Sequence, residues 1–263
     1  MDLFLIIGIF TGLCAIVAGM TMKGASITVL LSPEAAMVIL VGTTAAVMNS
    51  FPKSEFLKIP KLLGILFKEK KGDNPVEIIG KFVEMSKSTR KDGLLSLENT
   101  IRDIENKFMK KGLEMVVDGV EPEYTRELLE MEIEAMEERH RLGATIFTTA
   151  GSTSPTLGVL GAVIGLIGAL GNLADTAKLG ESIAAAFVAT LYGIFFGYVV
   201  FHPFSSRLKR KSHDELICMN IMLEGILSIQ LGENPKSIEN KLVSMLEPGE
   251  KLKYYASQPQ GDK

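Results

Sequence analysis

Residues 145–173 read TIFTTAGSTSPTLGVLGAVIGLIGALGNL, and no Asp, Glu, Lys or Arg interrupts them. A helix needs about 20 mainly apolar residues to cross the hydrocarbon core of a bilayer, so this stretch predicts a membrane span. Three other runs have the same character and predict spans over about residues 3–22, 33–50 and 183–203. We therefore expect an all-α integral membrane protein with four transmembrane helices.

The composition favours a membrane protein that also has a charged soluble part. The chain is 47% hydrophobic with a mean hydropathy of +0.25, yet 22% of its residues are charged. Both averages fit one chain only if apolar and charged residues are segregated into different blocks. The net charge of −3 argues against a nucleic-acid binder. Cys14 and Cys218 give neither a disulfide framework nor a metal site.

The basic residues predict the orientation of the spans. They follow the second and fourth spans, whereas the loops after the first and third spans are short. Because cytoplasmic flanks are enriched in Lys and Arg, both basic sides and both termini are expected in the cytoplasm. The predicted organisation is a hairpin over 1–50, a helical cytoplasmic loop over 51–143, a second hairpin over 144–203, and C-terminal helices with a polar tail over 204–263. The basic residues are Lys53, Lys58, Lys61, Lys68, Lys70, Lys71, Arg207, Lys209, Arg210 and Lys211.

Amphipathic helices are expected on the cytoplasmic side, where apolar residues recur at helical spacing. No glycine-rich nucleotide loop after a strand, HExxH zinc motif or GxSxG nucleophile motif occurs, so no cofactor is predicted. His202 lies near Ser205 and Ser206, but no acid is available to orient it as a base, so we do not expect an enzyme. The predicted helices cover about 75–85, 94–108, 122–141, 217–229 and 238–246.

Small residues form one stripe along each helix of the second predicted hairpin. Such stripes allow close helix approach, and they leave two interpretations open. They can pack the two helices of the hairpin together, or they can line a space filled by another chain's helix. Pro155 removes a backbone hydrogen bond inside the third span and predicts a kink. The stripes are Gly151, Ser154, Gly158, Gly161, Gly165, Gly168 and Asn172 in the third span, and Ser182, Ala186, Ala189, Gly193 and Gly197 in the fourth.

The predicted span interiors carry no Asp, Glu, Lys or Arg. Proton or sodium translocation generally uses a titratable group at membrane depth. If the protein conducts ions, the carboxylate must therefore come from a partner. This chain can supply hydroxyls, of which Thr190 in the fourth span is the main candidate, with Tyr192 nearby.

Three motifs resemble the MotA family of flagellar stator proteins, within the MotA/TolQ/ExbB proton channel superfamily. They are MSKSTRKDGLLSLE at 85–98, PTLGVLG at 155–161, and ATLYG at 189–193 ahead of His202-Pro203. The order of two hairpins around a charged loop is also similar to the family. The resemblance covers essentially the whole chain and implies a stator subunit in the bacterial cytoplasmic membrane.

The resemblance also implies partners and residue roles. In the family, an Arg and a Glu placed as Arg90 and Glu98 contact the rotor protein FliG. Prolines placed as Pro155 and Pro203 couple ion flow to loop movement. Five MotA copies surround two helices of the single-span protein MotB, whose aspartate carries the ion.

The ion path implied by the resemblance runs along the second hairpin. Its lining residues would be Thr190, Ala162, Ala189, Gly158, Gly161, Gly165 and Tyr192. Sodium-driven relatives have Thr at the positions of Ala162, Ala189 and Thr190. A sodium ion needs several oxygen ligands. Because only Thr190 keeps a hydroxyl here, a proton is expected as the coupling ion.

Two other functions remain open from the sequence. One is an ExbB- or TolQ-like energiser of an envelope system, although those proteins have three spans and an external N-terminus. The other is a membrane scaffold that conducts no ions and recruits partners through its cytoplasmic helices.

Overall fold

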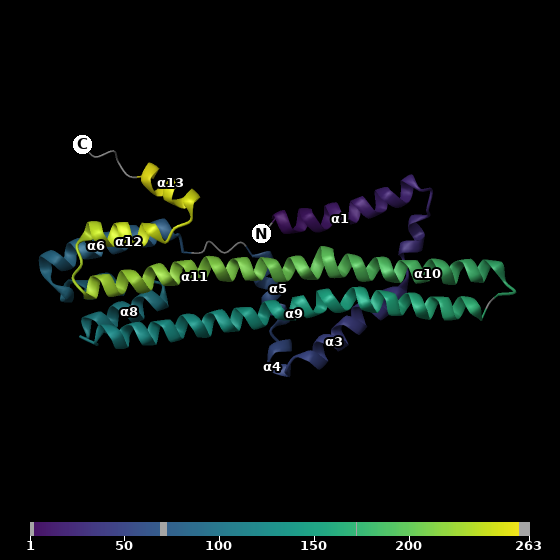
Figure 1. Cartoon of the computed structure of the whole chain (residues 1–263), viewed down its shortest axis with the longest axis horizontal. Helices are drawn as coiled ribbons and strands as arrows, with labels where there is room; N and C mark the ends of the chain where they lie inside the picture. Colours follow the sequence, from purple (N-terminus) through teal and green to yellow (C-terminus); the bar gives the residue numbers. More distant parts are fainter. Residues whose placement is uncertain (1–2, 69–72, 172, 258–263) are drawn as a thin grey trace. The chain divides into compact units, whose positions relative to one another are not determined.

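The structure is a computed structural model that describes residues 3–68, 73–171 and 173–257. Its elements are helices joined by turns, with no strand among these residues, and four helices contain an apolar stretch long enough to cross a membrane (Figure 1). The predicted all-α fold with four transmembrane helices is therefore confirmed. Lys70, Lys71, Asn172 and the polar tail beyond Ser257 lie outside the described residues. The four helices are Leu3–Met22, Ile27–Ser50, Pro122–Leu170 and Thr176–Gln230.

The chain folds into two compact units. Unit 1 comprises Met1–Lys70 and His140–Arg210, and unit 2 comprises Lys71–Arg139 and Lys211–Lys263. Unit 1 holds the apolar spans, and unit 2 holds most of the charged helices.

Unit 1 begins with seven elements before the chain enters unit 2. Its second span starts where Ser32 caps a helix, because the Ala35 amide donates to the Ser32 hydroxyl at 3.2 Å and Pro33 follows the cap. The elements are α1 (Leu3–Met22), the 3₁₀ turn η1 (Ile27–Leu30), α2 (Pro33–Ala36), the π-helical η2 (Met37–Val41), α3 (Gly42–Ser50), α4 (Lys53–Phe56) and α5 (Ile59–Phe67).

Helices α4 and α5, which lie within the predicted cytoplasmic loop over 51–143, belong to unit 1. The reason is the apolar face of α5. Leu66 is fully buried in a cluster with Leu5, Phe147 and Phe204, and Leu62 packs against it. Burial of this face fixes α5 against the membrane-spanning helices.

The third span is part of a much longer helix than the sequence predicted. We expected separate helices over 122–141 and 145–173, but α9 runs without interruption from Pro122 to Leu170. The one possible stop signal there is Gly143, but it does not adopt the left-handed conformation of a helix C-cap, so the helix continues through it. The fourth span is likewise part of a continuous helix, made of α10 (Thr176–Ile194), the π-helical η4 (Phe195–Phe201) and α11 (His202–Gln230).

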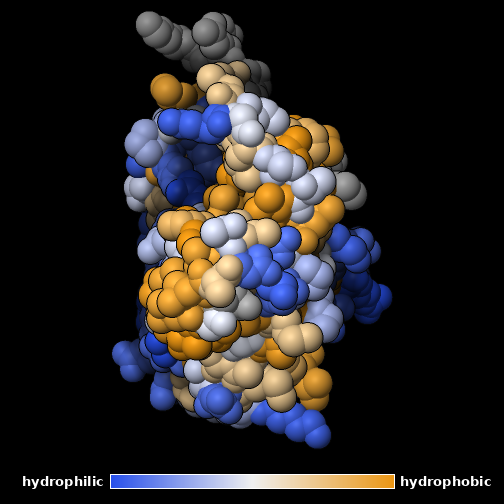
Figure 2. All heavy atoms as spheres, turned by 90° about the vertical axis from the view of Figure 1, so that its right-hand side faces the viewer, coloured by the Kyte–Doolittle hydropathy of each residue, from blue (hydrophilic) through white to orange (hydrophobic). Residues whose placement is uncertain are grey.

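The α9–α10 hairpin is closed by a short turn that Asp175 caps. The Asp175 carboxylate accepts the amides of Ala177 and Lys178, each at 3.2 Å. Figure 1 shows α9 and α10 side by side along their apolar halves. Apolar side chains face outward on unit 1: in α1, Phe4 is 79% and Phe10 65% exposed. Figure 2 views the end that carries the α9–α10 turn, and hydrophobic residues cover much of it.

In unit 2, shorter helices pack around the N-terminal part of α9 and the C-terminal part of α11. Asn74, Asn106 and Asn234 cap α6, α8 and α12 by accepting a backbone amide with their side chains. Its core is a single cluster that includes Phe82, Leu113, Leu129 and Ile226. The helices are α6 (Pro75–Asp92), the 3₁₀ turn η3 (Leu94–Ser96), α7 (Leu97–Arg102), α8 (Lys107–Val117), α12 (Pro235–Ser244) and α13 (Pro248–Ser257).

Candidate functional site

The small residues of the second hairpin bring α9 and α10 to near backbone contact. A Cβ atom placed on Gly158 would lie 3.2 Å from the Cα of Gly193, and one on Gly165 would lie 2.8 Å from the Ala186 Cβ. A Cβ on Gly161 would lie 2.7 Å from the Ala189 Cβ. The stripe therefore serves hairpin packing, the first of the two interpretations. A further role of these glycines in lining a partner helix stays a prediction.

Thr190 lies at this contact and bonds across it. Its hydroxyl is 3.3 Å from the Ala186 carbonyl of its own helix and 3.4 Å from the Gly158 carbonyl of α9. Ala189 is buried beside it, and Ala162 on α9 is half-buried. The hydroxyl proton can go to either carbonyl, which leaves the oxygen lone pairs free to accept a hydrogen bond.

Tyr192 does not share this contact, although the sequence grouped it with Thr190. Two residues along a helix differ by about 200°, so its side chain points to another face. The Tyr192 hydroxyl donates to the Leu30 carbonyl of η1. It also lines an apolar cavity of about 400 Å³ with residues such as Leu13, Ile16 and Phe196.

The two predicted coupling prolines occupy different positions. Pro155 lies inside α9 against Gly197, where a Cβ would approach the proline ring to 2.8 Å. Pro203 lies in the first turn of α11, directly after the π-helical η4. Because proline has no amide proton, it cannot complete the α-helical bond to the preceding turn. π-Helical turns often mark functional positions, and this one was not predicted from the sequence.

Polar side chains gather near Pro203 on the α9 and α11 faces of unit 1. The Thr148 and Ser205 hydroxyls lie 2.7 Å apart, and Ser205 is buried. The His202 ring lies where a Cβ on Gly151 would approach it to 2.9 Å, and it stacks on Tyr198. His202 is thus an interfacial packing residue in this structure.

The predicted rotor residues lie on two different helices. Arg90 is in the last turn of α6 and Glu98 in the first turn of α7. Gly93 ends α6 with a φ of +80°, a conformation that favours glycine, so the two residues do not share one helix face. Both are exposed, and no ion pair to either is present among the residues that the structure describes.

Leu95 adds an apolar group between these charges that the sequence analysis missed. It lies in η3 and is 69% exposed, whereas Leu97 two residues later is fully buried. Leu95 falls outside the helical stripe of Leu94, Leu97 and Ile101, and this was the one signal in the sequence that could have marked it as exposed.

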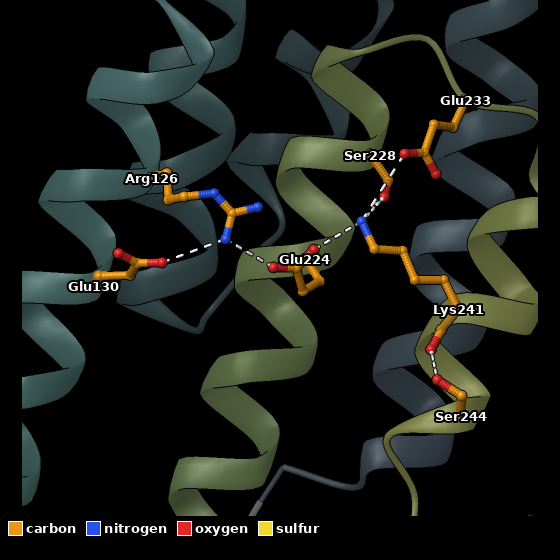
Figure 3. A network of polar contacts seen from close by, with 7 residues as sticks. All are labelled: Arg126, Glu130, Glu224, Ser228, Glu233, Lys241 and Ser244. Carbon is orange, nitrogen blue, oxygen red and sulfur yellow. Dashed lines mark hydrogen bonds and ion pairs between the residues drawn. The ribbon is translucent and has the colours of Figure 1, made fainter.

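A network of ion pairs joins three helices of unit 2 (Figure 3). Glu224 of α11 accepts Arg126 of α9 at 2.9 Å and Lys241 of α12 at 2.7 Å. Burial by itself raises the pKa of Glu224, but the hydrogen bonds from Lys241 and Arg126 outweigh it and lower that pKa. The hydrogen bond to Glu224 raises the pKa of Arg126. Partners that lie far apart in the chain leave no sequence signal.

Cys218 of α11 is chemically protected. Burial, together with nearby carboxylates such as Asp73, raises the pKa of its thiol to about 12. The thiol donates to the Asp73 backbone carbonyl at 3.2 Å. Cys218 is therefore a packing residue.

Comparisons with known proteins agree with this architecture. The MotA/TolQ/ExbB proton channel family matches residues 100–221. The chain is 48% identical to motility protein A of Bacillus subtilis over 97% of its own length and 94% of that protein, and 36% identical to motility protein A of Borreliella burgdorferi over 98% of each. It also matches the solved structure of the flagellar MotAB stator complex from Bacillus subtilis, with a TM-score of 0.89 over 95% of this chain and 98% of that one. The chain therefore belongs to the MotA family of flagellar stator proteins, as a multi-pass protein of the inner membrane.

Proposed function

We propose that this chain is the ion-conducting stator subunit of the bacterial flagellar motor. It would assemble in five copies around a MotB-type single-span partner and apply torque to FliG of the rotor, with both termini in the cytoplasm. One observation carries the proposal: the α9–α10 hairpin has no Asp, Glu, Lys or Arg between 145 and 170 or between 183 and 203. A hairpin of this kind needs a partner's carboxylate to move an ion. The similarity to a MotAB stator complex supports the assembly.

The proposed mechanism begins at Thr190. A protonated partner aspartate can donate a hydrogen bond to the Thr190 oxygen, because the Thr190 proton can be directed to the Gly158 or Ala186 carbonyl. The ionised aspartate has no proton to donate, so this bond is lost on proton release. Pro155 and Pro203 would then let the helices rearrange, since both interrupt the helical hydrogen-bond ladder. No catalytic step by this chain is part of the proposal.

Arg90 and Glu98 are proposed to pass the force to the rotor. Exposed charge pairs are weak, and they steer association while dissociating quickly, which suits contact with a moving surface. Leu95 between them offers apolar area to the same contact.

Deletion of the gene tests the function directly. We expect cells that build complete filaments but do not rotate, with rotation restored by the wild-type gene. The Arg90→Glu, Glu98→Lys variant is expected to restore it poorly, because both charges that meet the rotor are reversed. Filaments are scored by microscopy and rotation by tethering. Normal swimming of the deletion strain, in cells without a second stator set, would refute the stator function.

Proton coupling predicts that rotation does not depend on sodium. Only Thr190 keeps a hydroxyl among the three positions at which sodium-driven relatives have threonines, and one hydroxyl is a poor sodium site. Rotation speed at fixed proton-motive force should stay unchanged when external sodium is replaced by potassium. A loss of speed on this replacement would show sodium coupling instead.

Thr190→Val separates a conducting stator from a passive scaffold. Valine keeps the shape of threonine but removes the hydroxyl that meets the Gly158 carbonyl. We expect the variant to reach the membrane in normal amount and to rotate the motor at clearly reduced speed, measured by tethering and by immunoblot of membranes. A scaffold would tolerate the change without any loss of speed. An ExbB- or TolQ-like role has no support from the four-span architecture.

A further inference from the structure

The ion network of unit 2 centres on one carboxylate. Glu224 is the least exposed charged group in it, at 21%, and its two oxygens bind different partners: Arg126 to Oε1 and Lys241 to Oε2. Lys241 also donates to the Ser228 hydroxyl at 3.2 Å and lies 3.9 Å from Glu233 (Figure 3). Helices α9, α11 and α12 and the turn that joins α11 to α12 are thereby held at one point.

The turn between α11 and α12 also contacts α6, the helix that carries Arg90. The Ser86 hydroxyl of α6, which is buried, donates to the Glu233 backbone carbonyl at 3.3 Å. Ser86 lies one helical turn before Arg90. The Phe82 ring of α6 rests on Gly225, the residue after Glu224, where a Cβ would approach the ring to 2.6 Å. Helix α6 therefore contacts Glu233 itself and Gly225, the residue that follows Glu224.

The ion network contributes more to the orientation of the helices in unit 2 than to the stability of that unit. Its charges are partly exposed, and such pairs are individually weak. The stability of unit 2 comes from its large apolar core. Apolar contacts hold α6 close to α11 and α12 but tolerate small rotations, whereas ion pairs and the Ser86 hydrogen bond have fixed directions.

We infer that Glu224 is a positioning residue for torque transfer: it fixes α12 and the α11–α12 turn, and through Ser86 it sets the orientation of α6 and Arg90. The inference rests on the proposed stator function.

The test compares Glu224→Gln with Glu130→Gln. Glu130 also binds Arg126, at 3.3 Å, but both residues are on α9, so its loss disconnects no helix from another. We expect Glu224→Gln to lower torque per stator unit near stall about two- to fivefold, the population change expected from losing one or two such pairs. The number of fluorescently tagged units per motor should stay as in wild type. Glu130→Gln should match wild type in torque per stator unit and in the number of units per motor.

A double-mutant cycle on torque tests whether the effect acts through Arg90. If Glu224 positions Arg90, then Glu224→Gln should cost little further torque in an Arg90→Ala background. Additive losses would overturn the inference, as would wild-type torque in Glu224→Gln.

Two further outcomes are decisive. Lys241→Gln removes the same ion pair from the α12 side and should reproduce the torque loss. If Lys241→Gln and Glu224→Gln instead fail to accumulate in the membrane, the network has only a structural role and the inference is wrong. Failure of the wild-type gene to restore rotation to a paralysed deletion strain would contradict the stator function itself, which distinguishes the two failures.

Discussion

Gly193→Ala is expected to remove most of the assembled protein from the membrane and to abolish motility. A Cβ at this position would lie 2.6 Å from the Ser154 carbonyl oxygen and 2.9 Å from the Gly158 Cα. Both are backbone atoms of α9, so no side chain can move aside, and the two helices would have to separate. Overpacking of this kind typically costs about 1–3 kcal/mol, and more where the backbone cannot yield. Immunoblots of membranes and swimming in soft agar measure the loss.

Gly180→Ala is the matched control for this substitution. Gly180 lies on the same helix, and no atom lies within 4 Å of a Cβ placed there. The control should accumulate and swim as wild type, with a small gain in helix propensity. Equal accumulation of Gly193→Ala and Gly180→Ala would contradict the close approach of α9 and α10.

Phe82→Ala is expected to destabilise unit 2 by about 3–5 kcal/mol, the usual cost of truncating a buried phenylalanine. Phe82 is fully buried and rests on Gly225, so its removal leaves a cavity between α6 and α11. Hydrogen exchange of the purified full chain, followed by mass spectrometry, should show a large loss of amide protection in α6 and α12.

Leu95→Ala gives the comparison for a solvent-facing apolar residue. Because its side chain is already exposed, the change should alter stability by less than about 0.5 kcal/mol and leave protection in α6 unchanged. If Phe82→Ala were equally silent in hydrogen exchange, the core assignment of unit 2 would be wrong.

The sequence was sufficient to predict the spans, because long uncharged runs in a charged chain have one physical explanation. It was not sufficient to predict where the helices end. The third span was separated from the preceding amphipathic helix at 142–144 because the hydropathy changes there. A change of hydropathy does not end a helix, and Gly143 keeps a helical conformation. Hydropathy also could not predict that α5, within the predicted cytoplasmic loop, packs its apolar face inside unit 1.

The candidate site was predicted residue by residue but not in its arrangement. Spacing identified the small-residue stripe but could not tell which helix would fill it, and α10 does. Arg90 and Glu98 were predicted as a pair, and the positive φ of Gly93 places them on two helices. In the Glu224 network, directly bonded residues lie up to 98 positions apart, which local patterns cannot connect.

The environment of the two thiols has a practical consequence for spectroscopy. Cys218 is buried, and its raised pKa leaves little of the nucleophilic thiolate at neutral pH, so the thiol should react slowly. Cys14 is exposed on the apolar helix α1, a membrane span, where the bilayer would shield it from water-soluble maleimides. The two natural cysteines should therefore be labelled only weakly by such dyes. A single thiol introduced by Leu95→Cys would then be the main labelling site of this chain, so that fluorescence anisotropy of the labelled protein can follow the turn that we propose contacts the rotor, without replacement of either natural cysteine.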